Sequence, residues 1–299
     1  MKPALAESPQ RNNMFTVFAH AKINLTLEVI GRREDGYHEI ASVLQTIDLA
    51  DELTFQPADT IGFVCRDTGL SRAELLEETI LGAADLLQSA TGCDKGVRIQ
   101  FERARVPRAA GLGSSSSVPA AVLKGLNELW SLGLSLEELS WLASKLGSDT
   151  PFFIYGGTAM ARGRGEHITP LPSLPETWIV LLRPAIDPIP EKTAKMYSGL
   201  SSSDFTSGAE TQRLTEMLQQ GNSLPFEVLC NTFESAAFDF VPSLKEYRQK
   251  LLAAGAERVH LAGSGPMLFT LVSGKTQGET LVNRLEREAL EVYLTRTVL

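Results

Sequence analysis

Hydrophobic and polar positions alternate near the beginning of the chain. Between residues 22 and 30 the apolar set is Ile23, Leu25, Leu27 and Val29, and the polar set is Lys22, Asn24, Thr26 and Glu28. Because successive side chains of a β-strand point to opposite faces, this pattern predicts a strand with one polar face. A strand over 15–18 precedes it. Asp35-Gly36 signals a tight turn, after which strands over 40–47 and 52–55 continue an antiparallel sheet.

Helical periodicity takes over after this β-rich opening. A helix over 71–90 is predicted from its pattern and from Ser71 and Glu74, which have the spacing of a capping box. A strand over 97–102 follows. A helix over 118–130 comes next, with one apolar stripe at helical spacing formed by Val118, Ala121, Val122, Leu126 and Leu129. Pro119 is tolerated in a first turn, which predicts that this helix begins near Ser117.

The remaining elements are mixed. Ser135 and Glu138 form a second capping box, for a helix that we expect Gly147 to end. Residues 152–164 predict a short helix or turn that leads into a strand, and 178–182 predicts a buried strand. The second half predicts helices near 191–199, 209–220, 226–238 and 242–254, strands over 258–262 and 267–272 around a glycine turn, and a last helix and strand. Serine-rich residues 198–207 predict a flexible loop.

The length of 299 residues favours two packed lobes over one, because single cores usually stop growing near this size. We expect residues 1–13 to form a loose tail, 14–170 an N-terminal lobe and 171–299 a C-terminal lobe.

Charge and cysteine usage narrow the class of protein. The formal net charge is −8, without a run of Lys and Arg that would follow a phosphate backbone, which argues against a nucleic-acid partner. Three cysteines without paired spacing predict a reduced, cytoplasmic location. The beginning is too polar for a signal peptide, and no apolar run approaches the roughly 18 residues of a membrane span.

A segment rich in glycine and serine lies between the strand over 97–102 and the helix after it. It consists of Pro107, Arg108, Ala109, Ala110, Gly111, Leu112, Gly113, Ser114, Ser115, Ser116 and Ser117. Small residues let a backbone approach an anion closely, and the amides of a first helical turn point at it. The segment lacks the Gly-Lys-Ser/Thr of a Walker A loop and the third glycine of a dinucleotide fingerprint, and the protein-kinase motifs are absent. From the segment alone, a flexible entry to a serine-capped helix stays an alternative.

The pattern Pro-x-x-x-Gly-Leu-Gly-Ser-Ser resembles the ATP-binding loop of the GHMP kinases. Two more elements of that family follow the same order, the lysine-bearing strand AHAKINLTLEV and the glycine turn LAGSGPMLF at 261–269. The resemblance runs from about Phe18 to Val272. It implies an α+β, two-lobed GHMP-kinase-like fold, with a mixed sheet and helices in the N-terminal lobe and an α/β sandwich in the C-terminal lobe.

Longer stretches resemble one branch of this family, including RREDGYHEI and LGSDTPFFIYGGTAMARGRGE. That branch transfers the γ-phosphate of ATP to the 2-hydroxyl of 4-diphosphocytidyl-2-C-methyl-D-erythritol, in the non-mevalonate route to isoprenoid precursors. There are departures. Val118-Pro119 follows the serines where the family has Asp or Asn and then alanine, which bears on nucleotide affinity. The family's Ser-Thr before a substrate-side helix reads Lys192-Thr193, and its Asn-Asp reads Asn231-Thr232.

The resemblance assigns two catalytic residues. Asp149, in Gly-Ser-Asp-Thr-Pro, matches the family's catalytic aspartate, which takes the proton of the attacking hydroxyl. From spacing alone, Asp149 is equally an N-cap before Thr150-Pro151. Lys22 would orient Asp149 or the hydroxyl and offset developing negative charge. From composition alone, it is a solvated strand lysine.

The resemblance also assigns the substrate side. The residues that match substrate contacts are Asn24, Tyr37, His38 and Thr193, although Tyr37 and His38 are by pattern a pair that packs across a sheet. We expect ATP with Mg²⁺ as cofactor, with a serine among Ser114–Ser117 as metal ligand and the ligand set left open. Gly263-Ser264-Gly265 either closes the phosphate side or is only a tight turn. Another GHMP kinase, of the mevalonate or phosphomevalonate type, and a non-catalytic relative that binds ATP or a metabolite are the alternative functions. Oligomeric state is left open.

Overall fold

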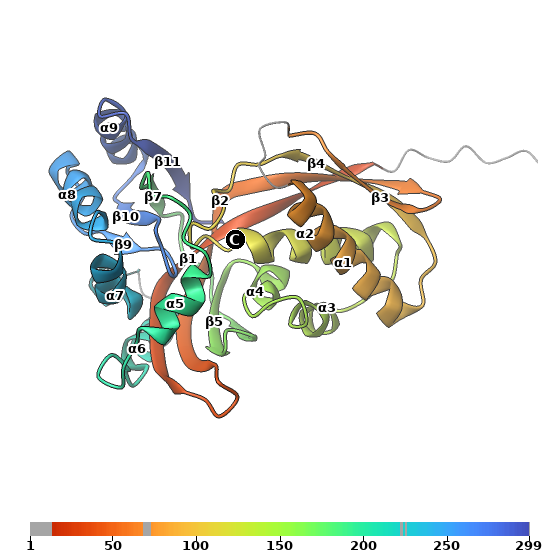
Figure 1. Ribbon diagram of the computed structural model, residues 1–299, viewed down its shortest axis with the longest axis horizontal. Coiled ribbons are helices and arrows are strands. Elements are labelled where there is room, and N and C mark those ends of the chain that lie inside the picture. Colours follow the sequence, from red (N-terminus) through yellow and green to blue (C-terminus); the bar gives the residue numbers. More distant parts are fainter. Residues whose placement is uncertain (1–13, 68–72, 222–223, 225, 299) are drawn as a thin grey trace, which may run out of the picture.

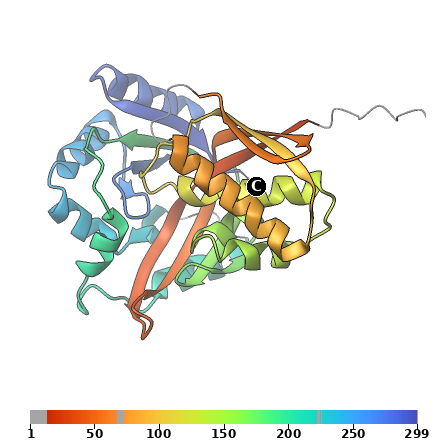
Figure 2. The ribbon, with the colours of Figure 1, turned by 45° about the vertical axis from the view of Figure 1, so that its right-hand side comes forward.

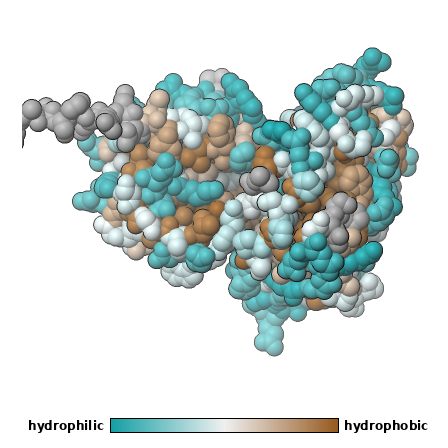
Figure 3. All heavy atoms as spheres, turned by 180° about the vertical axis from the view of Figure 1, so that it is seen from behind, coloured by the Kyte–Doolittle hydropathy of each residue, from teal (hydrophilic) through white to brown (hydrophobic). Residues whose placement is uncertain are grey.

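The computed structural model describes residues 14–67, 73–221, 224 and 226–298. The predicted tail at 1–13 and the predicted cap at Ser71 lie outside these residues. Within the described part of the chain, no helix is long and apolar enough to cross a membrane. The molecule has two bodies, which lie side by side along its longest axis (Figure 1), and hydrophilic side chains cover much of the face seen from behind (Figure 3).

A seven-stranded sheet organises the first body, in the order β3-β4-β2-β1-β8, with β5 paired to β2 and β6 to β5. Its strands are β1 (Phe15–Arg32), β2 (His38–Ala58), β3 (Ile61–Cys65), β4 (Gly96–Arg103), β5 (Thr158–Gly163), β6 (His167–Pro170) and β8 (Cys230–Asn231). β1 and β2 form a long antiparallel hairpin. The rest of this sheet is therefore assembled along that hairpin.

The β1–β2 hairpin is more continuous than the sequence predicts. The predicted strands over 15–18 and 22–30 are one strand, and so are those over 40–47 and 52–55. The β1–β2 register shifts between His20 and Ala21 and again between Asn24 and Thr26. A bulge adds a residue and bends a strand without ending it, so these irregularities let β1 continue past the positions where a regular ladder would fail.

Helices from the N-terminal part of the chain pack on the first sheet (Figures 1 and 2). They are α1 (Ala73–Thr91), α2 (Ser114–Leu129), α3 (Leu136–Ala143) and α4 (Thr150–Tyr155). Their apolar faces form one core with the sheet, which includes the fully buried Phe55, Phe101 and Phe152. The capping box of Ser135 and Glu138 is confirmed, although α3 ends at Ala143 rather than at Gly147.

The start of α2 corrects a prediction. The helix begins at Ser114 instead of near Ser117, so Ser114–Ser117 are its first turn and not part of a loop. Gly113 at φ 78° sets the sharp entry, and its carbonyl accepts from the amides of Ser116 and Ser117. Pro119 therefore lies inside the helix, just beyond its first turn, where its missing N–H leaves only one carbonyl without a donor.

A four-stranded sheet organises the second body, in the order β11-β7-β10-β9. Its strands are β7 (Trp178–Arg183), β9 (His260–Leu261), β10 (Leu268–Val272) and β11 (Glu291–Arg296). The helices of this part of the chain are α5 (Lys192–Ser198), α6 (Ala209–Gln219), α7 (Phe233–Phe240), α8 (Leu244–Ala254) and α9 (Lys275–Glu286), with a short 3₁₀ helix at Phe226–Val228. Of these, α6 packs on β1 and β2 of the first sheet. The predicted single helix over 226–238 is wrong, because β8 interrupts it to pair with β1.

The chain leaves the first sheet at Pro170 and enters the second at Trp178. It returns to the first sheet when Cys230 and Asn231 of β8 pair with Thr26 and Leu27 of β1, and again near its end, where Thr297 forms a bridge with Ile47 of β2. The two bodies are thus joined by backbone pairing along β1 as well as by the connection after β6. The division into lobes at residue 170 stays a prediction.

The packing of Phe55 against α2 yields a stability prediction. The Phe55 ring is fully buried, and it lies so close to Gly125 that an added Cβ there would be 2.7 Å from it. We expect Phe55→Ala to lower the free energy of unfolding by about 3–5 kcal/mol, because it leaves a cavity that this contact cannot close. Denaturant unfolding measures the change. Phe18→Ala, on the neighbouring strand with the side chain 55% exposed, is the matched control and should change it by less than about 0.5 kcal/mol.

Candidate active site

A cleft of about 880 Å³ lies where the two bodies meet. The N-terminal half contributes β1, the segment before α2 and the start of α2, and α5 and the 263–264 turn close it from the other half. Lys22, Asn24 and Asp149 all line it. The segment 107–117 contributes Arg108, Ala109, Ala110, Gly111, Gly113, Ser114 and Ser115 to the lining. Pro107, Leu112, Ser116 and Ser117 are not among the lining residues.

Lys22 is buried on the polar face of β1, with 4% of its surface exposed. Its ammonium donates to Asn24 Oδ1 at 2.7 Å and lies 3.5 Å from Asp149 Oδ2. Its backbone amide donates to the Leu112 carbonyl at 3.0 Å, so β1 holds the segment before α2 directly. The alternative interpretation of Lys22 as a solvated strand lysine is therefore wrong.

Asn24 fixes the orientation of Lys22. Asn24 Nδ2 donates to Ser42 Oγ at 2.8 Å, and the Ser42 hydroxyl donates to the Thr26 carbonyl. All three residues are buried. With its amide hydrogen engaged by Ser42, Asn24 presents its carbonyl oxygen to the lysine, which has no freedom to turn away.

Asp149 directly precedes α4, but its side chain makes no capping hydrogen bond. The carboxylate is free to face the cleft, where its side chain is 39% exposed. Room for it depends on Gly165, since a Cβ at that position would lie 3.3 Å from Asp149 Oδ1. The structure thus brings Lys22 and Asp149 together and does not use Asp149 as a side-chain cap.

The segment before α2 adopts a backbone that glycine favours. Gly111 and Gly113 have φ of 86° and 78°. A Cβ on Gly111 would lie 1.9 Å from the Ala262 carbonyl oxygen, and one on Gly113 would lie 2.6 Å from the Phe153 ring. The Met267 amide donates to the Ala110 carbonyl at 3.2 Å. The 261–267 turn is therefore packed directly on this segment, with no space for a side chain between them.

The N-terminus of α2 suits an anion. Helix geometry leaves the amides of Ser114 and Ser115 without partners inside the helix, and both residues line the cleft. Ser117 is buried, and its hydroxyl has no partner. The described residues contain no group of three His, Cys, Asp or Glu able to hold a metal. The donor set therefore fits a Mg²⁺ carried mainly by nucleotide phosphates, with a serine hydroxyl and the Asp149 carboxylate near it.

A buried carboxylate anchors Arg108. Asp51 is fully buried, and its Oδ1 accepts from the amides of Arg105 and Val106. Its Oδ2 forms an ion pair with Arg108 at 2.9 Å, and Arg108 also donates to the Ser114 carbonyl. Burial raises the pKa of the Asp51 carboxyl, and the Arg108 guanidinium opposes that rise. Sequence reasoning missed Asp51, because the two amides from which it accepts lie 54 and 55 positions further along the chain.

An aromatic group forms the wall beside β2. His38 stacks on Tyr197 with ring centroids 4.9 Å apart, and Tyr197 meets Phe233 edge to face at 4.8 Å. Tyr197 and Phe233 line the cleft. His38 is not among the lining residues, and its ring stacks on Tyr197. Burial, with the Asp149 charge, raises the pKa of the Tyr197 hydroxyl above its ordinary value. Sequence reasoning missed Tyr197 and Phe233, because both lie in helices where they follow the apolar pattern.

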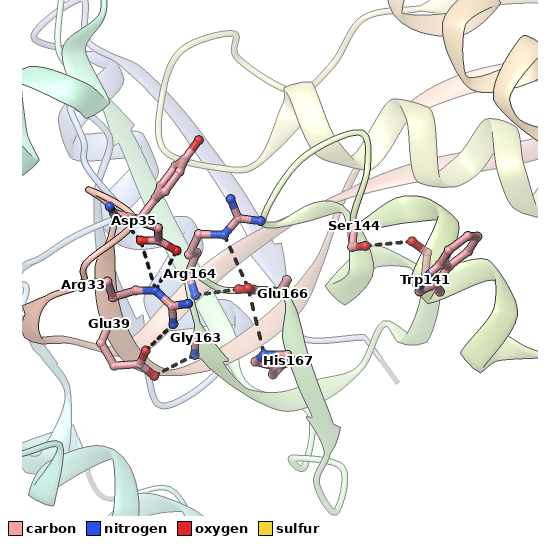
Figure 4. A network of polar contacts seen from close by, with 10 residues as sticks. Arg33, Asp35, Glu39, Trp141, Ser144, Gly163, Arg164, Glu166 and His167 are labelled. Atoms are coloured by element: carbon pink, nitrogen blue, oxygen red, sulfur yellow. Dashed lines mark hydrogen bonds and ion pairs between the residues drawn. The ribbon is translucent and has the colours of Figure 1, made fainter.

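Tyr37 is not among the residues that line the cleft; it is 53% exposed, with the Arg164 guanidinium 4.6 Å from its ring centre. Arg164 lines the cleft and pairs with Glu166. Figure 4 shows the network beneath it, in which Glu39 joins Arg33 to the Gly163 amide. This network ties the β1–β2 turn to the β5–β6 turn.

The wall from the second body carries Lys192 and Thr193 at the start of α5. The Thr193 and Ser264 hydroxyls are 3.0 Å apart. The Lys192 ammonium donates to the Ala109 carbonyl at 3.1 Å. Of the residues assigned to the site from sequence, Asn24 and Thr193 thus line the cleft together with Lys22 and Asp149.

Comparison with known proteins identifies the family. The family model described as "GHMP kinases N terminal domain" matches residues 78–157, and the one described as "GHMP kinases C terminal" matches residues 212–292. The chain belongs to the GHMP kinase family. The two-lobed α+β fold expected from the resemblance is confirmed.

Relatives of this GHMP kinase span nearly the whole chain. A protein of Dehalococcoides mccartyi, named 4-diphosphocytidyl-2-C-methyl-D-erythritol kinase, is 43% identical over 285 residues, which cover 95% of this chain and 99% of the relative. A crystal structure of 4-(cytidine 5'-diphospho)-2C-methyl-D-erythritol kinase is similar with a TM-score of 0.78 and 34% identity, covering 95% of this chain and 99% of that one. Homoserine kinase from Cytophaga hutchinsonii shares the fold, with a TM-score of 0.73 at 17% identity over 99% of this chain and 98% of that one.

The contact between Gly111 and Ala262 predicts that a side chain at position 111 lowers the stability of this GHMP kinase. We expect Gly111→Ala to lower the free energy of unfolding by at least about 2 kcal/mol more than Gly36→Ala does. Both glycines have nearly the same φ, 86° and 85°, so both substitutions carry the same backbone strain of about 1–2 kcal/mol. Only at Gly111 does the new Cβ meet a carbonyl, because Gly36 has nothing within 4 Å. Equal losses in denaturant unfolding would show that the segment moves away from the 261–267 turn without cost.

Proposed function

We propose that this GHMP kinase transfers the γ-phosphate of ATP to the 2-hydroxyl of 4-diphosphocytidyl-2-C-methyl-D-erythritol, in the non-mevalonate route to isoprenoid precursors. The observation that carries the chemistry is the Lys22–Asp149 pair, 3.5 Å apart inside the cleft and next to the N-terminus of α2. The choice of substrate is supported by the 43% identity to a relative that carries the name of this kinase.

The pair supplies what phosphoryl transfer to an alcohol requires. Asp149 accepts the proton of the attacking hydroxyl as it adds to phosphorus, and its partly exposed carboxylate is accessible to that hydroxyl. Lys22, held by Asn24, orients the carboxylate and stabilises the charge that develops on the transferred group. Because Lys22 is buried, its attraction to an anion is screened less than that of a surface lysine.

The nucleotide is placed by the segment before α2. Free amides at Ser114 and Ser115 receive the phosphates, and Gly111 and Gly113 let the segment that carries them pack closely on Ala262 and Phe153. Mg²⁺ would neutralise charge on the phosphates when bound, and Ser114 and Ser115 are the serines of this turn that line the cleft beside it. Apolar side chains of α1, including Leu75 and Leu76, line the same cleft and offer a surface to a base.

The acceptor is placed at the opposite wall. Tyr197 and Phe233 offer flat apolar surfaces for a pyrimidine, and His38 packs behind Tyr197. Asn24, which contacts Lys22, and Thr193, which contacts Ser264, line the same cleft. Tyr37 contributes through Arg164, which it holds at the rim. A reduced, cytoplasmic location stays a prediction, and the three cysteines are free.

The Val118-Pro119 departure favours the second candidate, a relative that binds nucleotide without transferring phosphate. Val118 lines the cleft and is buried, so an apolar side chain stands where the resembled family has a polar one. The intact Lys22–Asp149 pair argues against this candidate, because a binding protein gains nothing from a carboxylate beside the phosphates.

The roles of the pair predict a loss of turnover without a loss of fold. We expect Asp149→Asn and Lys22→Met each to lower kcat by about 10²- to 10⁴-fold, since each removes a group that acts only as the phosphoryl group moves. Steady-state kinetics with saturating ATP measure this. Asp85→Asn, an exposed residue of α1, is the matched control and should leave kcat unchanged. Near-normal turnover in both variants would contradict the assigned roles.

The substrate assignment predicts a preference in a panel of acceptors. With ATP and Mg²⁺, we expect phosphorylation of 4-diphosphocytidyl-2-C-methyl-D-erythritol and at least about 100-fold lower kcat/KM for mevalonate, phosphomevalonate and homoserine, which lack a ring for the aromatic wall. Preference for one of those acids would favour another GHMP kinase activity. ATP binding without transfer to any acceptor would favour the non-catalytic candidate.

A further inference from the structure

Lys192 reaches into the nucleotide side of the cleft from the second body. It is the first residue of α5, and its ammonium donates to the Ala109 carbonyl at 3.1 Å. Ala109 belongs to the segment before α2 and has φ 54°. The side chain thus crosses from one wall of the cleft to the other, close to the backbone that would receive the phosphates. The resemblance to known GHMP kinases gives a serine at this position, so neither the fold nor α5 requires a lysine.

Lys192 differs from the other cationic side chains that line the cleft, because in the ranges that the structure describes they are paired with carboxylates and it is not. Three arginines line it, and each has a carboxylate partner: Arg108 with Asp51 at 2.9 Å, Arg164 with Glu166 at 3.4 Å and Arg183 with Glu291 at 3.1 Å. Lys22 has Asp149. No carboxylate among the described residues lies within 4.0 Å of the Lys192 ammonium, although Glu191 is its neighbour in the chain. Lys192 is therefore the cleft cation whose charge is not already balanced.

The surroundings of Lys192 disfavour its charge until an anion arrives. Burial, with the positive charge of Lys22, lowers the pKa of the Lys192 ammonium to about 8. Among the cations that the structure describes, Asp149 pairs with Lys22 alone, so the charge of Lys192 adds to that of Lys22 without a carboxylate of its own. A phosphate placed between them removes the repulsion and gives Lys192 a charged acceptor in place of a neutral carbonyl.

We propose that Lys192 is a second phosphate-binding cation, which holds the terminal phosphates of ATP from the side of the second body, opposite Lys22. The inference rests on the proposed kinase function, because it assumes that ATP occupies the cleft. The choice of ATP over the diphosphate of the acceptor follows from the contact with Ala109, which places the ammonium at the nucleotide segment. Lys192 takes part in binding, and the proton transfer stays with Asp149.

Titration calorimetry with MgATP, in the absence of any acceptor, tests this directly. We expect Lys192→Ser to weaken MgATP binding by about 10- to 100-fold, the range of a hydrogen bond to a charged group. Lys192→Arg keeps the charge and should bind within about fivefold of the unmodified protein. Lys195→Ser is the matched control, since Lys195 is an exposed lysine of the same helix outside the cleft, and it should bind MgATP within about twofold. CDP, titrated separately, should bind the unmodified protein and Lys192→Ser equally.

The pH dependence of MgATP binding gives a second readout, which a structural role would not produce. Only the protonated ammonium attracts phosphate, so affinity should fall about tenfold between pH 7 and pH 9 as the free lysine loses its proton. Lys192→Ser and Lys192→Arg should both lack this fall. The other charged or titratable groups that line the cleft are present in all three proteins, so the comparison removes their titration: Lys22, Arg108, Asp149, Arg164, Arg183, Glu191 and Tyr197.

The failures of this inference and of the proposed function are distinguishable. Unchanged MgATP affinity in Lys192→Ser, or weakening that Lys192→Arg does not restore, overturns the role of Lys192 and leaves the kinase function intact. Weakened binding of CDP instead of MgATP also overturns it, because it would assign the lysine to the acceptor. If the unmodified protein binds no MgATP at all, the proposed function fails first.

Discussion

The burial of one ammonium group constrains most of this structure. A lysine that is 4% exposed loses most of its hydration, which costs several kcal/mol unless polar partners replace the water. Asn24 and Asp149 are those partners for Lys22, and each requires support of its own. Asn24 needs the Ser42 hydroxyl on β2, and Asp149 needs the space beside Gly165. Elements from four parts of the chain are thus fixed around a single charge, and the fixed pair is also the one to which we assign the chemistry.

The cleft is held together by backbone as much as by side chains. The Lys22 amide binds the Leu112 carbonyl, the Met267 amide binds the Ala110 carbonyl, and Gly111 lies against Ala262 with no room for a Cβ. The segment before α2 is therefore gripped from both bodies at once. A ligand that entered between them would meet donors whose positions are already set, which reduces the ordering that binding must impose.

The sequence anticipates the parts of the site that depend on local pattern. Alternation over 22–30 places Lys22 and Asn24 on one face, and small residues before a helix indicate an anion site, even though the exact start of α2 at Ser114 was missed. The role of Asp149 came from resemblance, since its spacing equally suggested a cap. Asp51 and the Tyr197–Phe233 wall were not predicted, because their positions depend on long-range packing that periodicity does not encode.

The pairing of charges explains how a protein with a net charge of −8 can receive a polyanion. Its arginines at the cleft are each held by a carboxylate, so they fix backbone and rim in place while contributing little excess charge. The lysines are arranged differently: Lys22 pairs with the partly exposed carboxylate of Asp149, and Lys192, among the residues described, donates only to the carbonyl of Ala109. Positive potential that is not offset by a partner is therefore concentrated at these two lysines, which both contact the segment before α2, where an incoming phosphate gains most from it. The paired arginines thus hold the cleft in position, and the two lysines, whose charges are less fully offset, attract the phosphates. With this division, the surface can stay acidic without repelling the nucleotide from the cleft.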